Sequence, residues 1–166
     1  MKNLILRVKN LHNKFFSLVS YAQTPFLLFV RLYWGWQLVE SGWGKLHHLD
    51  KVTEFFTSLG LPMPGPTAVF ISSLEFLGGI LLALGLFSRL ISLMLTVNLI
   101  FAYITADREA LSSIFSEPDK FMAAAPFTFL CASLLILIFG SGKIAVDTLL
   151  GRWFPASEAR APGSSN

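Results

Sequence analysis

The sequence predicts an all-α fold: a four-helix transmembrane bundle with an N-terminal amphipathic helix. Hydrophobic residues make up 54% of the 166 residues and charged residues 14%. Ordinary soluble domains have about 45–50% apolar and about 25% charged residues. Four segments approach the roughly 20 mostly apolar residues that a spanning helix needs. None shows the period-two alternation of a β-barrel strand, so these segments must pair their backbone groups as helices.

Residues 1–22 are expected to form an amphipathic interfacial segment. Apolar residues recur there at helical spacing, and basic residues occupy other positions of the same segment. The apolar residues are Leu4, Ile5, Val8, Leu11, Phe15 and Leu18, and the basic residues are Lys2, Arg7, Lys9 and Lys14. This pattern is typical of a helix lying on an anionic membrane surface; the alternative is a basic tail that only sets topology. The first fifteen residues hold no unbroken apolar stretch as long as the hydrophobic region of a signal peptide, so no cleavable signal peptide is expected.

The membrane domain is expected over residues 23–150. Its four predicted spans are 25–41, 67–87, 90–106 and 122–139. Pro and Gly separate the first two spans, a very short turn at 88–89 makes a tight hairpin of the second and third, and a charged stretch precedes the fourth. The small, polar segment 151–166 is predicted to be a disordered tail.

The distribution of basic residues predicts that both termini are cytoplasmic. Outside the spans, eight Lys and Arg residues fall on the side of the termini and four on the other side. Basic residues concentrate on the cytoplasmic side of membrane proteins. The expected location is therefore the bacterial inner membrane, with the chain crossing it several times.

Arg31 and Glu75 are the residues least expected in their surroundings, because each lies within a predicted span. A charge at the bilayer centre costs about 2.5–3.5 kcal/mol on insertion scales, so each should have a partner. At 1.5 Å per residue they lie ~9 Å and ~18 Å from the cytoplasmic face, a gap that a long Arg side chain and helix tilt can bridge. We therefore expect an Arg31–Glu75 pair, either as a structural clasp or as a polar site for a quinone or small anion.

Glu40, Lys45 and His47 form a second candidate group at the outer end of the first span. They could bind an anion at the membrane surface, and His titrates near neutral pH. The alternative is an ordinary wet rim anchored by tryptophans. Adjacent His48 does not make a metal site, because consecutive helical side chains diverge, so no metal ligand is assigned.

Arg89, Lys143 and Asp147 are predicted to lie together on the cytoplasmic side, where they would form a structural ion pair. The single cysteine, Cys131, excludes an internal disulfide and a CxxC pair. Basic residues are scattered, which argues against nucleic-acid binding. Phosphate-loop, dinucleotide and Ser-His-Asp motifs are absent from the sequence, so no catalytic residue is assigned.

Three stretches resemble the DoxX family of small bacterial membrane proteins: RLYWG with the following GWGKL, LGLPMPGP leading to LEFLGGILLALGLFSR, and FGSGKIAVD. The resemblance covers roughly residues 25–150 and implies a four-helix membrane bundle. It also implies a link to redox chemistry, since relatives include the DoxD-type subunit of thiosulfate:quinone oxidoreductase. The sequence lacks redox cysteines and cofactor ligands, so independent catalysis is not expected and no intrinsic cofactor is assigned.

Two functions follow as hypotheses. In the first, the chain is a membrane subunit of a quinone-linked oxidoreductase system of thiosulfate or thiol type, and a redox protein partner supplies the redox centre. In the second, it is a non-catalytic anchor or assembly factor for such a partner. A small transporter would require a homo-oligomer, because 166 residues show no inverted repeat.

Overall fold

The computed structural model describes residues 2–153, and within them it holds helices and no strand. In chain order the helices are α1 (Lys2–His47), α2 (Leu49–Ser58), α3 (Pro64–Leu84), α4 (Ser88–Thr105), α5 (Arg108–Ser112), α6 (Pro118–Ala123), α7 (Pro126–Phe139) and α8 (Val146–Trp153). The expected all-helical class is confirmed. Helix α8 takes up the start of the segment 151–166, and the rest of that predicted tail lies outside the described residues.

The expected four spans correspond to three long helices and one short one. Among the described residues, α1 from Lys9, α3 and α4 are long and apolar enough to cross a membrane, whereas α7 is apolar but has 14 residues. Helix α7 begins at Pro126, four residues later than expected, because proline has no N–H with which to continue a helix from α6. The chain is thus a multi-pass membrane protein.

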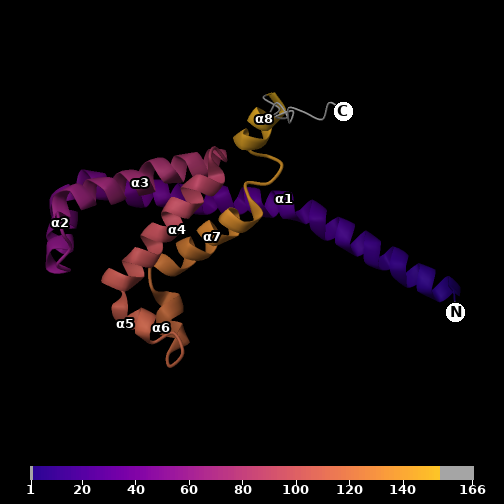
Figure 1. The fold of residues 1–166 in the computed structure, drawn as a ribbon, viewed down its shortest axis with the longest axis horizontal. Coiled ribbons are helices and arrows are strands. Elements are labelled where there is room, and N and C mark those ends of the chain that lie inside the picture. Colours follow the sequence, from indigo (N-terminus) through magenta and orange to yellow (C-terminus); the bar gives the residue numbers. More distant parts are fainter. Residues whose placement is uncertain (1, 154–166) are drawn as a thin grey trace, which may run out of the picture.

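Helix α1 is longer than the sequence pattern indicated. The segment 1–22 does not form a helix of its own: its described residues are the first part of α1, which continues through Pro25 to His47. We call the part of α1 before Pro25, residues 2–24, the N-terminal arm. Figure 1 shows the arm leaving the rest of the molecule at an angle, with no other helix beside it.

The long helices pack as two pairs. Helix α1 packs mainly on α3, and α4 packs mainly on α7. The pairs are inclined to each other, and α3 and α4 diverge from their common turn (Figure 1). A buried apolar cluster joins them: Val30 and Leu38 from α1, Leu82 from α3, Ile91 and Leu95 from α4, and Ala132 and Ile136 from α7.

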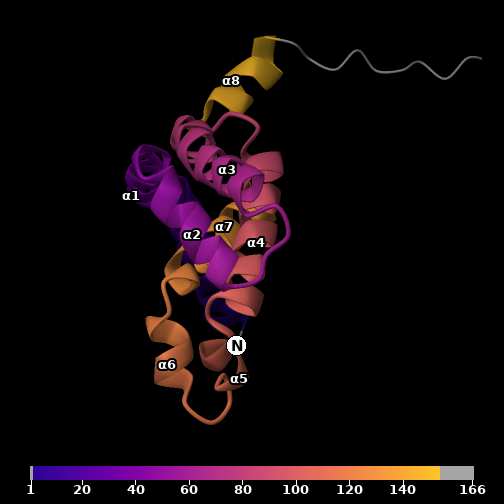
Figure 2. The same ribbon diagram turned by 90° about the vertical axis from the view of Figure 1, so that its left-hand side faces the viewer.

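The stretch 42–65, expected to be a loop, contains the end of α1 and the whole of α2. Helix α2 packs against α3. In Figure 2 it crosses in front of the other helices, running from the end of α1 toward α4. It therefore covers the region where the two helix pairs diverge.

Candidate functional site

Glu75 is the centre of a buried polar group on α3. Its side chain is only 7% exposed, and its carboxylate lies 2.6 Å from the Lys45 ammonium and accepts a 2.9 Å hydrogen bond from the Ser41 hydroxyl. Ser41 and Lys45 are four residues apart on α1, so both project from one face of that helix. The result is a two-helix clamp in which every polar atom of the carboxylate has a partner.

Glycines allow α1 and α3 to approach closely enough for this clamp. A Cβ added at Gly42 would lie 2.3 Å from the backbone nitrogen of Phe76, and one at Gly79 would lie 2.7 Å from the carbonyl oxygen of Gly35. Small residues at such crossings are characteristic of membrane helix pairs, because they let the backbones touch. Gly42 and Phe76 immediately neighbour Ser41 and Glu75, so this contact sets the geometry of the ion pair.

A cavity of about 520 Å³ opens beside the clamp. Ser41, Lys45 and Glu75 form one polar wall, and Asn98 from α4 adds an amide. Lys51 and Asp107 also line the cavity. Most of the remaining lining is apolar and comes from five helices: Leu38 (α1), Val52, Phe55, Phe56 and Leu59 (α2), Ile71 (α3), Leu99 and Phe101 (α4), and Phe129 (α7). A concave, mostly apolar space with a few convergent polar groups has the form of a small-molecule site.

Arg31 lies at the opposite end of the α1–α3 pair and is 1% exposed. Its guanidinium donates hydrogen bonds of 2.6 Å and 2.7 Å to the carbonyl oxygens of Ser141 and Ile144. It also packs against Gly85, where an added Cβ would collide with the guanidinium. Gly85 has φ of +73° and ends α3, so this position needs glycine both for its left-handed conformation and for the space that Arg31 fills.

Asp147 completes this end of the molecule by binding the start of α4. Its two carboxylate oxygens accept hydrogen bonds of 2.8 Å and 2.9 Å from the backbone N–H groups of Phe87 and Ser88. These are among the N–H groups that a helix start leaves unpaired, and a negative charge is favourable there. Asp147 and Arg31 together hold the 140–147 segment against the α3–α4 turn.

The structure corrects the expected Arg31–Glu75 pair. Gly85, which contacts Arg31, is ten residues beyond Glu75, so about 15 Å of helix separates the two charges. Each charge has its own partners: backbone carbonyls for Arg31, and Lys45 with Ser41 for Glu75. The prediction was wrong because α1 continues six residues beyond the expected span and carries Lys45 to the level of Glu75.

The expected ion pair among Arg89, Lys143 and Asp147 is also wrong. The carboxylate of Asp147 is used as a helix cap, while the Arg89 side chain packs over Gly140. Lys143 is exposed. The three residues do lie in the same region, but the backbone of the α4 start competes successfully for the single carboxylate.

The three members of the outer candidate group, Glu40, Lys45 and His47, do not form one site. Only Lys45 joins the cavity; Glu40 is exposed and is not part of its lining. The His47 ring packs at a tilt against the Trp43 ring, with centroids 4.2 Å apart, and its Nδ1 lies 2.9 Å from the Trp43 carbonyl oxygen. These contacts belong to a helix end at the membrane rim.

Sequence reasoning missed Ser41, Asn98 and the apolar side chains of α2. Two signals were present. Ser41 is one helical turn before Lys45, and Asn98 is an isolated amide within an apolar span. The spacing of Val52, Phe55, Phe56 and Leu59 also fits one face of a helix.

The fold and the site define a small multi-pass membrane protein whose helices line a mostly apolar cavity, with a partly buried ion pair on its wall. The chain belongs to the DoxX family, whose model matches residues 26–108. This range runs from just after Pro25 in α1 to the first residue of α5 and contains Arg31, Lys45 and Glu75.

A curated relative supports the same assignment. The chain is similar to a protein of Bacillus subtilis (strain 168) named "Putative oxidoreductase CatD", with 30% identity over 122 residues. The similarity covers 72% of this chain and 83% of the relative. No solved structure matches the chain.

Proposed function

We propose that this protein is a membrane subunit of a quinone-linked oxidoreductase system in the bacterial inner membrane, and that its cavity holds the quinone. The observation that carries the proposal is the Lys45–Glu75 pair on the wall of an otherwise apolar cavity of about 520 Å³. The relative's name describes an oxidoreductase, which supports a redox role for this chain.

The chemistry of the cavity suits both redox forms of a quinone. The Lys45 ammonium can donate a hydrogen bond to a quinone carbonyl, and the Glu75 carboxylate can accept one from a quinol hydroxyl. Phe and Leu side chains offer the ring and its apolar tail a matching surface. The volume lies within the range of about 300–1,000 Å³ that is usual for small-ligand pockets.

A small sulfur anion fits this wall less well. The cavity lining holds two lysines, Lys45 and Lys51, and two carboxylates, Glu75 and Asp107, so it carries no net positive charge for a second anion. Moving an anion from water into such an apolar space costs hydration free energy, and the charges of this site, which balance one another, do not compensate for that loss. We therefore place the quinone in the cavity and assign any sulfur chemistry to a redox protein partner.

The positive-inside count supports an orientation with both termini in the cytoplasm. In that orientation the cavity, which lies near α2 and the ends of α1 and α4, opens toward the outer side of the membrane. A redox partner that approaches from this side would exchange electrons with the bound quinone, because the single cysteine of this chain offers no redox pair.

The proposal is tested by titrating the full chain in nanodiscs with ubiquinone-1 and following quenching of tryptophan fluorescence. We expect saturable quenching that weakens roughly tenfold or more in Glu75→Gln and in Lys45→Met, since a charge-assisted hydrogen bond is lost in each. Glu40→Gln is the matched control: it removes an exposed carboxylate from α1 outside the cavity and should leave binding unchanged.

Non-saturable quenching would contradict a quinone site in the cavity. So would an affinity for ubiquinone-1 that is the same in Glu75→Gln, Lys45→Met and Glu40→Gln. A stable partner that co-purifies from native membranes equally well with Glu75→Gln and with the unaltered chain, in the absence of quinone binding, would favour the anchor or assembly factor instead.

A further inference from the structure

The N-terminal arm is longer than the membrane requires. Helix α1 has 46 residues, which at 1.5 Å per residue makes about 69 Å. The hydrocarbon core of a bilayer is about 30 Å thick, so the membrane part after Pro25 is already sufficient to cross it. The arm must therefore lie outside the hydrocarbon core, either projecting into water or resting on the membrane surface.

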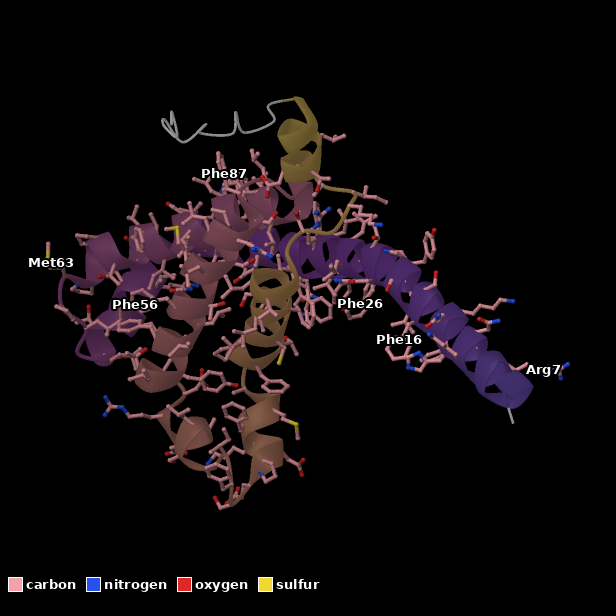
Figure 3. The ribbon with its side chains drawn as sticks, turned by 45° about the vertical axis from the view of Figure 1, so that its right-hand side comes forward. Arg7, Phe16, Phe26, Phe56, Met63 and Phe87 are labelled. Atoms are coloured by element: carbon pink, nitrogen blue, oxygen red, sulfur yellow. The ribbon has the colours of Figure 1, made fainter. Side chains whose placement is uncertain are left out.

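One continuous apolar stripe runs along the lipid-facing side of α1 and into the arm. Its members recur every three, four or seven residues, and each is at least half exposed: Leu11, Phe15, Val19, Phe26, Phe29 and Tyr33. The buried residues of the same helix, such as Leu27 and Arg31, lie on the other side, toward α3 and α7. Figure 3 shows the arm's side chains, Phe16 among them, standing clear of every other element.

Basic residues flank this stripe on both sides. At 100° per residue, Arg7 and Lys14 are about 80–100° from the stripe on one flank, and Lys9 is about 120° away on the other. All three side chains are exposed, and the first 39 residues of the sequence contain no Asp or Glu. Long basic side chains in these positions can reach headgroups while the stripe lies deeper.

Pro25 provides the place where the helix can turn. It lacks the N–H that would bond to the Tyr21 carbonyl, which weakens α1 at the boundary between arm and membrane part. A turn toward the lipid-facing side would bring the stripe down onto the membrane, because the stripe of the arm continues that of the span. In water, by contrast, a solitary helix with such a stripe would be marginally stable.

We propose that the arm lies on the cytoplasmic face of the membrane and binds anionic lipid headgroups through Arg7, Lys9 and Lys14. A second copy of the chain fits the stripe less well: a helix pair along it would bring Arg7 and Lys14 of both copies together without an acidic residue in either arm to balance them.

The test uses the full chain in nanodiscs, with Cys131→Ser to remove the native thiol and one new cysteine for an environment-sensitive fluorophore. Phe15→Cys places the label on the stripe, and Asn13→Cys places it on the opposite face. With phosphatidylglycerol present, we expect a blue-shifted emission at position 15 that lipid-borne quenchers reach, and an iodide-accessible label at position 13. In pure phosphatidylcholine both labels should report water.

Replacing Arg7, Lys9 and Lys14 by Gln should lower the docked-to-undocked ratio roughly fivefold for each charge removed, and salt should do the same. Lys143→Gln, an exposed basic residue outside the arm, is the matched control and should have no effect. Equal spectra in both lipids, or in the triple variant, would overturn the proposal. A short spin–spin distance between labels at position 15 of two copies would also overturn it, in favour of a dimer.

Discussion

At the scale of single residues, Gly42 is the position on which the candidate site most depends. A Cβ there would lie 2.3 Å from the Phe76 nitrogen and 2.7 Å from its Cα, which are backbone atoms that cannot move aside independently. Gly42→Ala should therefore push α1 from α3 and destabilise the fold by about 1–3 kcal/mol, as overpacking does. It should also weaken quinone binding by displacing Ser41 and Lys45 from Glu75.

Gly44 supplies the control for this prediction, because it lies in the same helix with nothing within 4 Å of an added Cβ. Gly44→Ala should leave binding unchanged and should raise the free energy of unfolding by up to about 1 kcal/mol, because alanine favours a helix more than glycine does. Thermal unfolding in detergent, followed by tryptophan fluorescence, measures both variants. Equal melting temperatures for Gly42→Ala and the unaltered chain would contradict the close contact.

The sequence predicted which residues needed partners better than it predicted the partners. Arg31 and Glu75 were recognised as buried charges, and both are buried. The carbonyls of Ser141 and Ile144 that receive Arg31 could not be foreseen, because every residue has a carbonyl and only the fold of the 140–147 segment aims these two. Lys45 was placed in a separate candidate group with Glu40 and His47, away from Glu75, because charge composition cannot reveal how far a helix extends.

At the scale of elements, Asp147 joins two parts of the chain that are far apart in sequence. It accepts hydrogen bonds from the N–H groups of Phe87 and Ser88, and its own N–H donates to the Gly85 carbonyl at 3.0 Å. Asp147→Ala should cost about 1–2 kcal/mol of stability, the usual effect of losing an N-cap, and Asp147→Asn should cost less because its amide oxygen still accepts one bond. Thermal unfolding in detergent measures whether Asp147→Ala melts at a lower temperature than Asp147→Asn, and Asp147→Asn at a lower temperature than the unaltered chain.

The Asp147 variants should differ from the cavity variants in one measurable property, their affinity for quinone. Asp147 lies at the other end of the bundle from Glu75, so both variants should bind ubiquinone-1 as the unaltered chain does wherever they remain folded. If Asp147→Asn and Asp147→Ala melted alike, at the temperature of the unaltered chain, the capping role would be excluded.

The elements themselves were predictable where apolar runs are long. The spans at 67–87 and 90–106 correspond to α3 and α4, and the fourth span was expected to end at residue 139, where α7 ends. Helix α2 was missed because Asp50, Lys51 and Glu54 gave its segment the composition of a loop. Its apolar face covers a cavity rather than a continuous core, and a single short helix gives a weak periodic signal.

At the scale of the whole molecule, the cavity arises from how the two helix pairs diverge. The α3–α4 turn is tight, and Leu86 closes it with a 2.9 Å backbone hydrogen bond to Leu81. Away from this turn, Ile71 and Glu75 on α3 face Asn98 and Leu99 on α4 across the cavity. A count of spans predicts a bundle, but hydropathy does not record the angle at which the two helix pairs pack.

The same arrangement predicts a topology that can be measured. The turn with Asp147 and Lys143 and the loop between α5 and α6 lie at opposite ends of α4, so the membrane should separate them. Phe115 is 95% exposed and Lys143 is exposed, which makes both suitable for cysteine labelling in a Cys131→Ser background. The excess of Lys and Arg on the side of the termini predicts that Lys143 lies in the cytoplasm. A membrane-impermeant maleimide added to spheroplasts should therefore label Phe115→Cys and spare Lys143→Cys until the membrane is broken. The reverse pattern would invert the chain, place the cavity on the cytoplasmic side, and require a redox partner from that compartment.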